Sequence, residues 1–238
     1  MGPFVDCHSH VLATGDDGAR VSTETRALCR EAARRGTGIL FATPHVWPHL
    51  PLSPDREAEI RRAYAAARPE AGLELRLGFE LTPSVTLLRD DPRRYMLEGT
   101  EHVLMEVPFT GPPDLLWQLG NHVEAAGLRP VIAHPERSQA ALDDPGLARA
   151  LVERGWTLQV NSTSLLGYHG REEEELGWVL LEEGLAGIVA SDGHRAARPP
   201  RLDEAWDRVR ARLGDDAVRF FDGSALGLAL DRPASAAA

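Results

Sequence analysis

Imidazole and carboxylate side chains, which are common ligands of divalent metal ions, follow six of the seven short apolar runs in the sequence. His8 and His10 are two residues apart after the first run, so in an extended chain their rings face the same side. Taken singly, such a histidine is more often a buried residue with a hydrogen-bond partner than a metal ligand, and such a glutamate is more often a helix cap. The full set is Asp6, His8, His10, Asp16 and Asp17 after the first run, His45 after the second, Glu80 and Glu106 at the ends of the third and fourth, His134 after the fifth, and Asp192 and His194 after the seventh.

The joint placement of these groups predicts a multinuclear metal site. If the runs are parallel strands, the side chains that follow them converge at one end of the sheet, and without a cation they would repel one another or stay unsatisfied. A mixture of nitrogen and oxygen donors suits Mn, Fe or Zn better than Ca or Mg.

The seven apolar runs are predicted strands at residues 2–7, 38–42, 73–79, 102–107, 130–133, 157–160 and 186–190. Most of them are apolar on both faces, as in a buried parallel sheet. Helices are predicted between them at 22–35, 56–67, 114–126, 145–154 and 172–182, several of them stopped by a glycine. The runs recur roughly every 30 residues, the length of one strand-plus-helix unit.

These repeats predict an α/β fold consisting of one closed, seven-unit barrel. The predicted domain covers residues 1–230 without a break in composition, and the Ala, Ser and Pro-rich tail 231–238 is predicted to be disordered. In such barrels the active residues lie at the carboxyl ends of the strands, where the candidate ligands fall.

Composition narrows the class of protein. The chain has 238 residues, 43% of them hydrophobic, and no apolar run near the ~20 residues that span a bilayer. The start of the chain lacks the pattern of a secretory signal, and Cys7 and Cys29 are too few for a disulfide scaffold, so we expect a soluble cytoplasmic protein. A net charge of −10 argues against nucleic acid and against anionic membranes as partners.

In sequence order, the strings DCHSH, DDG, ATPH, GFE, MEVP, IAHPER, VNSTSLLG and ASDGH with RPP resemble the polymerase and histidinol phosphatase (PHP) superfamily. Within it they are most similar to the capsule-type, manganese-dependent protein tyrosine phosphatases of the CpsB/CapC kind. The resemblance implies a distorted (β/α)7 TIM-like barrel that holds three divalent ions, with Mn favoured and Fe or Zn as alternatives.

Carried over motif by motif, the resemblance implies a ligand set for each ion. The first ion would take His8, His10, Glu80 and Asp192, the second Asp16, His45 and His194, and the third Glu80 as a bridge together with Glu106 and His134. Asp6 is expected to orient a ligand imidazole.

Charge at this site predicts an anionic substrate. The positive charge of three divalent ions exceeds the negative charge of four carboxylate ligands, so the site has a net positive charge within an acidic protein. Arg137 and Arg198 stand beside the ligand motifs and are predicted to contact phosphoryl oxygens.

The predicted reaction is hydrolysis of a phosphomonoester by a metal-bridging hydroxide, without a covalent enzyme intermediate. A phenolate, with a parent pKa of about 10, leaves with little protonation, so the lack of a clear extra acid favours aryl esters such as phosphotyrosine. We therefore expect a phosphotyrosine protein as substrate, free phosphate as product, and a bacterial tyrosine kinase as a candidate partner. Homo-oligomerisation is left open.

Other readings stay open at this point. They are a phosphatase of a small metabolite such as histidinol phosphate, a nuclease at oligonucleotide ends, an amidohydrolase-like metal hydrolase, and a regulatory module without activity. Many amidohydrolases bridge their metals with a carbamylated lysine, and this chain contains no lysine. Cys29 and Arg35 have the Cys-x5-Arg spacing of cysteine-dependent phosphatases, but the residues between them are helix formers without glycine. We expect Cys29 to be non-catalytic.

Overall fold

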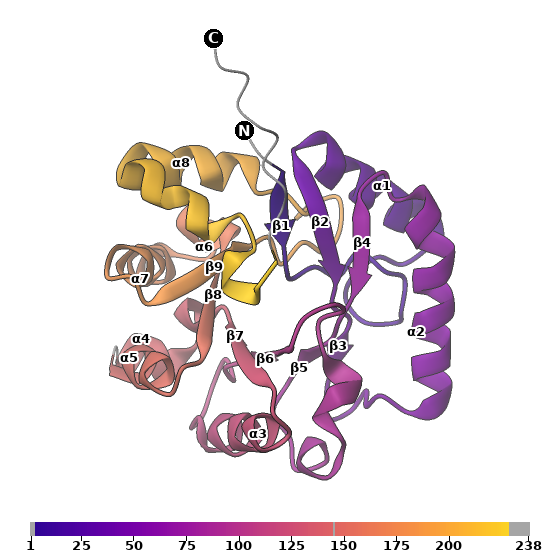
Figure 1. Cartoon of the computed structure of the whole chain (residues 1–238), viewed down its shortest axis with the longest axis horizontal. Coiled ribbons are helices and arrows are strands. Elements are labelled where there is room, and N and C mark those ends of the chain that lie inside the picture. Colours follow the sequence, from indigo (N-terminus) through magenta and orange to yellow (C-terminus); the bar gives the residue numbers. More distant parts are fainter. Residues whose placement is uncertain (1–2, 145, 229–238) are drawn as a thin grey trace.

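The computed structural model describes residues 3–144 and 146–228, and the predicted tail 231–238 lies outside them. Figure 1 shows the strands in the middle of the molecule with the helices around them. The strands are β1 (Phe4–Asp6), β2 (Thr37–Ala42), β3 (His45–Val46), β4 (Glu74–Leu77), β5 (Glu80–Leu81), β6 (His102–Glu106), β7 (Arg129–Ala133), β8 (Thr157–Asn161) and β9 (Ala186–Ala190).

Every pair of neighbouring strands is parallel, in the orders β1-β2-β4 and β3-β5-β6-β7-β8-β9. Each of the seven predicted runs contains a strand, so the expected α/β class with parallel strands is confirmed. The sequence did not predict that β2 and β4 each stop and that the chain then continues as the short strands β3 and β5. Pro44, which has no N–H to donate, lies in the first interruption, and Gly78 lies in the second. A Cβ on Gly78 would come within 2.5 Å of the Leu97 side chain.

The segments that follow the first and the last strand also pair with each other. The His8 carbonyl accepts from the Asp192 N–H at 2.9 Å, and the Gly193 carbonyl accepts from the His10 N–H at 2.7 Å. Ser9 and Gly193 form a parallel bridge. The two ends of the strand order are therefore neighbours in space.

The helices are α1 (Ser22–Arg34), α2 (Pro54–Ala67), α3 (Asp114–Ala125), α4 (Gln139–Asp143), α5 (Gly146–Glu153), α6 (Ser162–Leu165), α7 (Arg171–Glu182) and α8 (Asp203–Leu213). Short 3-10 segments are η1 (Arg68–Glu70), η2 (Leu87–Arg89), η3 (Pro92–Tyr95), η4 (Pro135–Arg137), η5 (Gly214–Phe220) and η6 (Ser224–Leu226). The five predicted helices are α1, α2, α3, α5 and α7, each with ends within two residues of the prediction. The helices α4, α6 and α8 were not predicted.

Most strands are buried on both faces, as a two-sided apolar pattern predicts, whereas β4 is buried on one face only, with Glu74 exposed and Arg76 half-buried. A small apolar cluster takes alternate residues from five of the main strands, including Val5, Ile39, Leu104, Val131 and Ile188. A larger cluster lies between the other strand faces and the helices. In the described part of the chain, no helix has both the length and the apolar character needed to cross a membrane.

Candidate metal centre

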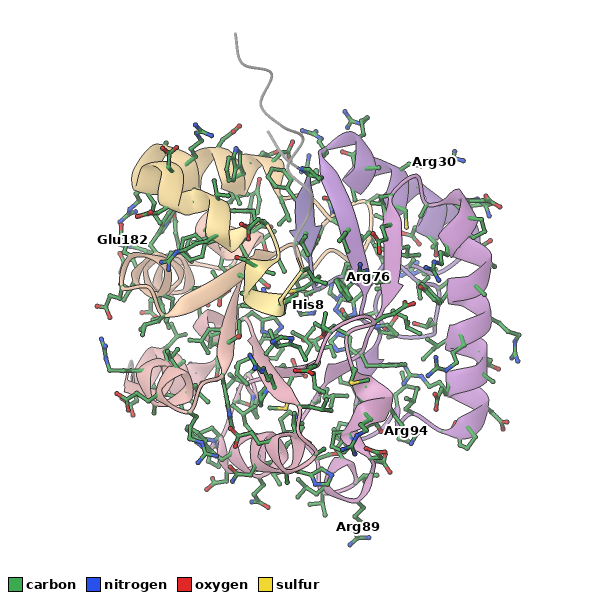
Figure 2. The ribbon with its side chains drawn as sticks, in the orientation of Figure 1. His8, Arg30, Arg76, Arg89, Arg94 and Glu182 are labelled. Carbon is green, nitrogen blue, oxygen red and sulfur yellow. The ribbon has the colours of Figure 1, made fainter. Side chains whose placement is uncertain are left out.

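The predicted ligands gather at the carboxyl ends of the strands. In Figure 2, His8 lies near the centre of the molecule, while the labelled Arg30, Arg89 and Glu182 lie at its edge. The predicted ligands His8, His10, His45, Glu80, Glu106, His134, Asp192 and His194 are all buried. A set of buried titratable groups this dense needs a compensating charge.

Four ligand atoms form a compact group around one point. His8 Nε2 lies 3.1 Å from His10 Nε2 and 3.2 Å from Glu80 Oε2. His10 Nε2 lies 3.2 Å from Glu80 Oε2, and Asp192 Oδ1 lies 3.6 and 3.4 Å from the two imidazole nitrogens. Ligand atoms placed tetrahedrally about 2.1 Å from an ion are about 3.4 Å apart. The spacing of the His8, His10 and Asp192 atoms therefore fits one divalent ion, and Glu80 Oε2 lies within 3.2 Å of both imidazoles as a further ligand atom.

Glu80 connects this group to a second set of ligand atoms. Its other oxygen, Oε1, lies 3.0 Å from His134 Nε2. Glu80 also belongs to groups of possible ligands with His8 and His134, and with His45 and Glu106. One carboxylate whose two oxygens face different partners suits a bridge between two ions, which is the role that the resemblance implied.

A third group of possible ligand atoms contains Asp17 and not the predicted Asp16. Asp17 Oδ1 lies 3.4 Å from His45 Nε2 and 3.2 Å from His194 Nε2, and these residues form a possible metal site with His10. Asp16, which the sequence analysis assigned as the ligand here, instead accepts hydrogen bonds from the backbone N–H groups of Gly18 and His45. Its carboxylate also faces His10 Nδ1 at 3.7 Å, so Asp16 orients this turn and that ring.

Burial and neighbouring charges shift the pKa values of two carboxylates at the cluster. Burial raises the pKa of the Glu106 carboxyl to about 8, and the negative charge of Glu80 adds to this. Burial also raises the pKa of Glu80, but the facing imidazoles of His8 and His45 outweigh it and hold that pKa well below its usual range. Among the described residues, the buried Oε2 atoms of Glu80 and Glu106 have no hydrogen-bond partner. These oxygens are free to bind a metal ion.

Two of the predicted ligands have strained backbones. Within residues 3–144 and 146–228, His134 (φ 33°) and Asp192 (φ 50°) are the only non-glycine residues with positive φ. Such conformations cost free energy and cluster at functional sites. His134 directly follows β7 and Asp192 lies two residues after β9, and the side chains of both face the cluster.

Two amides in β8 orient ligands and were not predicted. The side-chain oxygen Oε1 of Gln159 faces His8 Nδ1 at 2.9 Å. Because an amide oxygen only accepts hydrogen bonds, Nδ1 carries the proton and Nε2 keeps its lone pair for a metal. The Gln159 amide donates to Asn161 at 2.8 Å, and the Asn161 amide donates to Asp192 Oδ2 at 2.8 Å. Gln159 and Asn161 are two residues apart in β8 and alternate with the apolar Leu158 and Val160, a same-face signal that could have revealed them.

Asp6 does not orient an imidazole, which corrects its predicted role. Its Oδ1 accepts from the backbone N–H groups of Ser191 at 3.0 Å and His8 at 3.4 Å. Burial raises the pKa of Asp6 to about 6, against the opposing effect of its hydrogen bonds with Ser191. Asp6 thus ties together the two segments that carry His8 and Asp192.

Both predicted arginines lie beside Asp192. Arg137 Nη1 donates to Asp192 Oδ2 at 3.0 Å, and Arg198 Nη1 lies 3.6 Å from the same oxygen. Arg198 Nη2 also lies 3.0 Å from His194 Nε2. The arginine side chains are 20% and 28% exposed, so unlike the buried ligands they can be reached from solvent.

Comparison with known proteins agrees with this geometry. The family model for capsular polysaccharide synthesis, CpsB/CapC, matches residues 4–222. The chain belongs to the CpsB/CapC family. It is 33% identical over 197 residues to the tyrosine-protein phosphatase YwqE of Bacillus subtilis (strain 168), covering 80% of this chain and 77% of that protein. The resemblance seen in the motifs is therefore confirmed.

Solved structures agree on the fold. A crystal structure from a study of YwqE of Bacillus subtilis and CpsB of Streptococcus pneumoniae, described as metal-dependent tyrosine phosphatases, superposes with a TM-score of 0.79 at 29% identity. The match covers 90% of this chain and 89% of that one. An amidohydrolase from Burkholderia ambifaria with bound Zn has a TM-score of 0.54 at 15% identity and covers 97% and 86% of the two chains, a likeness of fold alone.

In this CpsB/CapC member the cysteine–arginine spacing does not form a phosphate loop. Cys29 and Arg35 lie in and at the end of α1, and Cys29 is buried in the apolar core. Burial raises the pKa of the Cys29 thiol to about 12, the opposite of what a nucleophilic thiolate requires. Cys7 is likewise buried in the core beside Val5 and Ile39.

Proposed function

We propose that this protein is a metal-dependent protein-tyrosine phosphatase with three divalent ions, manganese foremost, in one active site. The observation that carries the proposal is the four-atom group of His8, His10, Glu80 and Asp192, with two arginines beside it. A positive site with accessible guanidinium groups suits a phosphate monoester. The family and its relatives named tyrosine-protein phosphatases support the same reading.

The proposed ligand sets are those that the resemblance implied, with Asp17 taken in place of Asp16 because Asp17 lies beside His45 and His194. One ion would be held by His8, His10, Glu80 and Asp192, a second by Asp17, His45 and His194, and a third by Glu80, Glu106 and His134. When bound, such ions supply a water activated near neutral pH and positive charge that polarises the phosphoryl oxygens.

The protein's own groups would bind and orient the ester. Arg137 and Arg198 would donate to nonbridging phosphoryl oxygens, since each has Nη1 beside Asp192 Oδ2 and a guanidinium group carries further N–H donors. Asn161 holds Asp192 Oδ2, which leaves Asp192 Oδ1 to face the ligand imidazoles. An aryl ester would need little help from an acid because its phenolate is a good leaving group.

We also propose that the strands form a distorted (β/α)7 barrel in a single domain over residues 1–230. The hydrogen bonds between the segments after β1 and β9, and the inner cluster from five strands, support closure. Both cysteines are free and buried, which supports a reducing, cytoplasmic location. A tyrosine kinase is the proposed source of the phosphorylated substrate, since such an enzyme forms the ester bond that this one would cleave.

A substrate panel tests the function. We expect the manganese-loaded protein to hydrolyse a phosphotyrosine peptide with a kcat/KM at least about 10-fold above that for histidinol phosphate, because the aryl leaving group needs no acid. Release of inorganic phosphate is measured for both substrates under the same conditions. A clear preference for histidinol phosphate would favour the alternative that the protein is a phosphatase of a small metabolite. If neither substrate is hydrolysed, the proposal is refuted.

Arg137 is expected to act on substrate rather than on the metals. Arg137→Ala removes a charge-assisted donor, so kcat/KM on phosphotyrosine peptide should fall by roughly 10–100-fold (about 1.5–3 kcal/mol) while metal content stays constant. The matched control is Arg212→Ala, because Arg137 lies over the Phe109 ring and pairs with Asp192, while Arg212 lies over the Trp178 ring and pairs with Glu182. Full activity of Arg137→Ala would show that the assigned role is wrong.

A further inference from the structure

Exposed large hydrophobic side chains are few among the described residues, and most follow strand ends. They are Val21, Val85, Phe109, Tyr168 and Val179. The first four lie in segments that follow β1, β5, β6 and β8, the side of the fold that carries the candidate ligands, and Val179 lies in α7.

Phe109 is the member of this set that touches the site. Its ring stacks on the His134 imidazole, with centroids 5.6 Å apart and an interplanar angle of 6°. The Arg137 guanidinium carbon lies 4.9 Å from the centroid of the same ring. Phe109 nevertheless stays 45% exposed, so much of its surface is open to a ligand.

The backbone holds Phe109 in this place. The Phe109 carbonyl accepts from the Gln139 N–H at 3.0 Å. The preceding Pro108 carbonyl accepts from the Ser138 hydroxyl at 2.8 Å. The loop after β6 is therefore tied to the segment after β7, which carries His134 and Arg137, and the ring has a defined position beside them.

We propose that Phe109 determines specificity by packing against the aryl ring of the substrate. This inference rests on the proposed function, in which Arg137 binds the phosphoryl group. A single ester oxygen separates phosphorus from the ring of an aryl phosphate. A substrate held by Arg137 therefore places its ring close to the phenyl group that Arg137 already contacts. Paired aromatic rings gain stabilisation beyond their buried area, which an alkyl group does not.

Binding of non-hydrolysable ligands tests this without turnover. Calorimetry on the manganese-loaded protein would measure Kd for benzylphosphonate, cyclohexylmethylphosphonate and inorganic phosphate. We expect the wild type to prefer the benzyl ligand over the cyclohexyl ligand. Phe109→Leu should weaken benzylphosphonate by about 3–10-fold, while phosphate binding and metal content stay within about twofold. Phe109→Tyr should keep the preference because the ring remains.

Phe109→Leu keeps an apolar side chain over His134. It therefore distinguishes the effect of losing the aromatic ring from the effect of exposing His134 to solvent. Val179→Ala, which removes an exposed apolar side chain from α7, is the matched control. Unchanged benzylphosphonate binding in Phe109→Leu, or an equal weakening of inorganic phosphate, would overturn the proposal. Failure of the wild type to hydrolyse phosphotyrosine peptide is a separate result that would refute the proposed function.

Discussion

Glu80→Ala is expected to lower the metal content of the protein by more than one ion per chain and to abolish phosphatase activity. The reason is that Glu80 Oε2 faces His8 and His10 while Oε1 faces His134, so one substitution removes a ligand from two ions. The wild type, loaded with manganese and desalted, should retain about two to three ions per chain, as a multinuclear hydrolase site does. Elemental analysis gives both counts.

Two controls make this result specific. Glu70→Ala removes a glutamate that is paired with Arg26 at the surface, and it should leave the count unchanged. Circular dichroism and thermal unfolding of Glu80→Ala would show whether the variant is folded. A count at or below one in the wild type would refute the trinuclear arrangement, as would a wild-type count in a folded Glu80→Ala.

Chelation should abolish activity, whereas thiol modification should not. Treatment with EDTA, or the substitution His10→Ala or Asp192→Ala, is expected to lower kcat/KM on phosphotyrosine peptide by more than about 1000-fold, because bound metal supplies several kcal/mol of transition-state stabilisation. Cys29→Ser should keep activity within about twofold, since Cys29 lies in the buried face of α1 with a raised thiol pKa. Initial rates of phosphate release measure all of these.

The opposite pattern would favour the mechanism of the cysteine-dependent phosphatases. Sensitivity to brief iodoacetamide treatment, together with indifference to EDTA, would overturn the metal-dependent reading. Restoring activity by adding manganese after EDTA is the matching control, because it shows that chelation removed an ion and did not unfold the protein.

Sequence alone determined the strands and nearly all candidate ligands. Most strands are buried on both faces, so they stand out as short apolar runs, such as the residues of β6 and β9, whereas β4 alternates polar and apolar residues. A histidine or carboxylate within a few residues of the end of such a run lies near the carboxyl edge of a parallel sheet. His45, His134 and Asp192 follow their runs by one to three residues, so the sequence predicts that they lie together.

Tertiary structure alone decided which groups inside the loops and strands face the cluster. Asp16 and Asp17 are adjacent carboxylates in an irregular segment without a regular period, and hydrogen bonds to Gly18 and His45 turn Asp16 away from the ligand position. The contact of Gln159 with His8 joins residues 151 positions apart in the chain. Local sequence determines which residues follow a strand, but the direction of a side chain in a loop depends on contacts with distant segments.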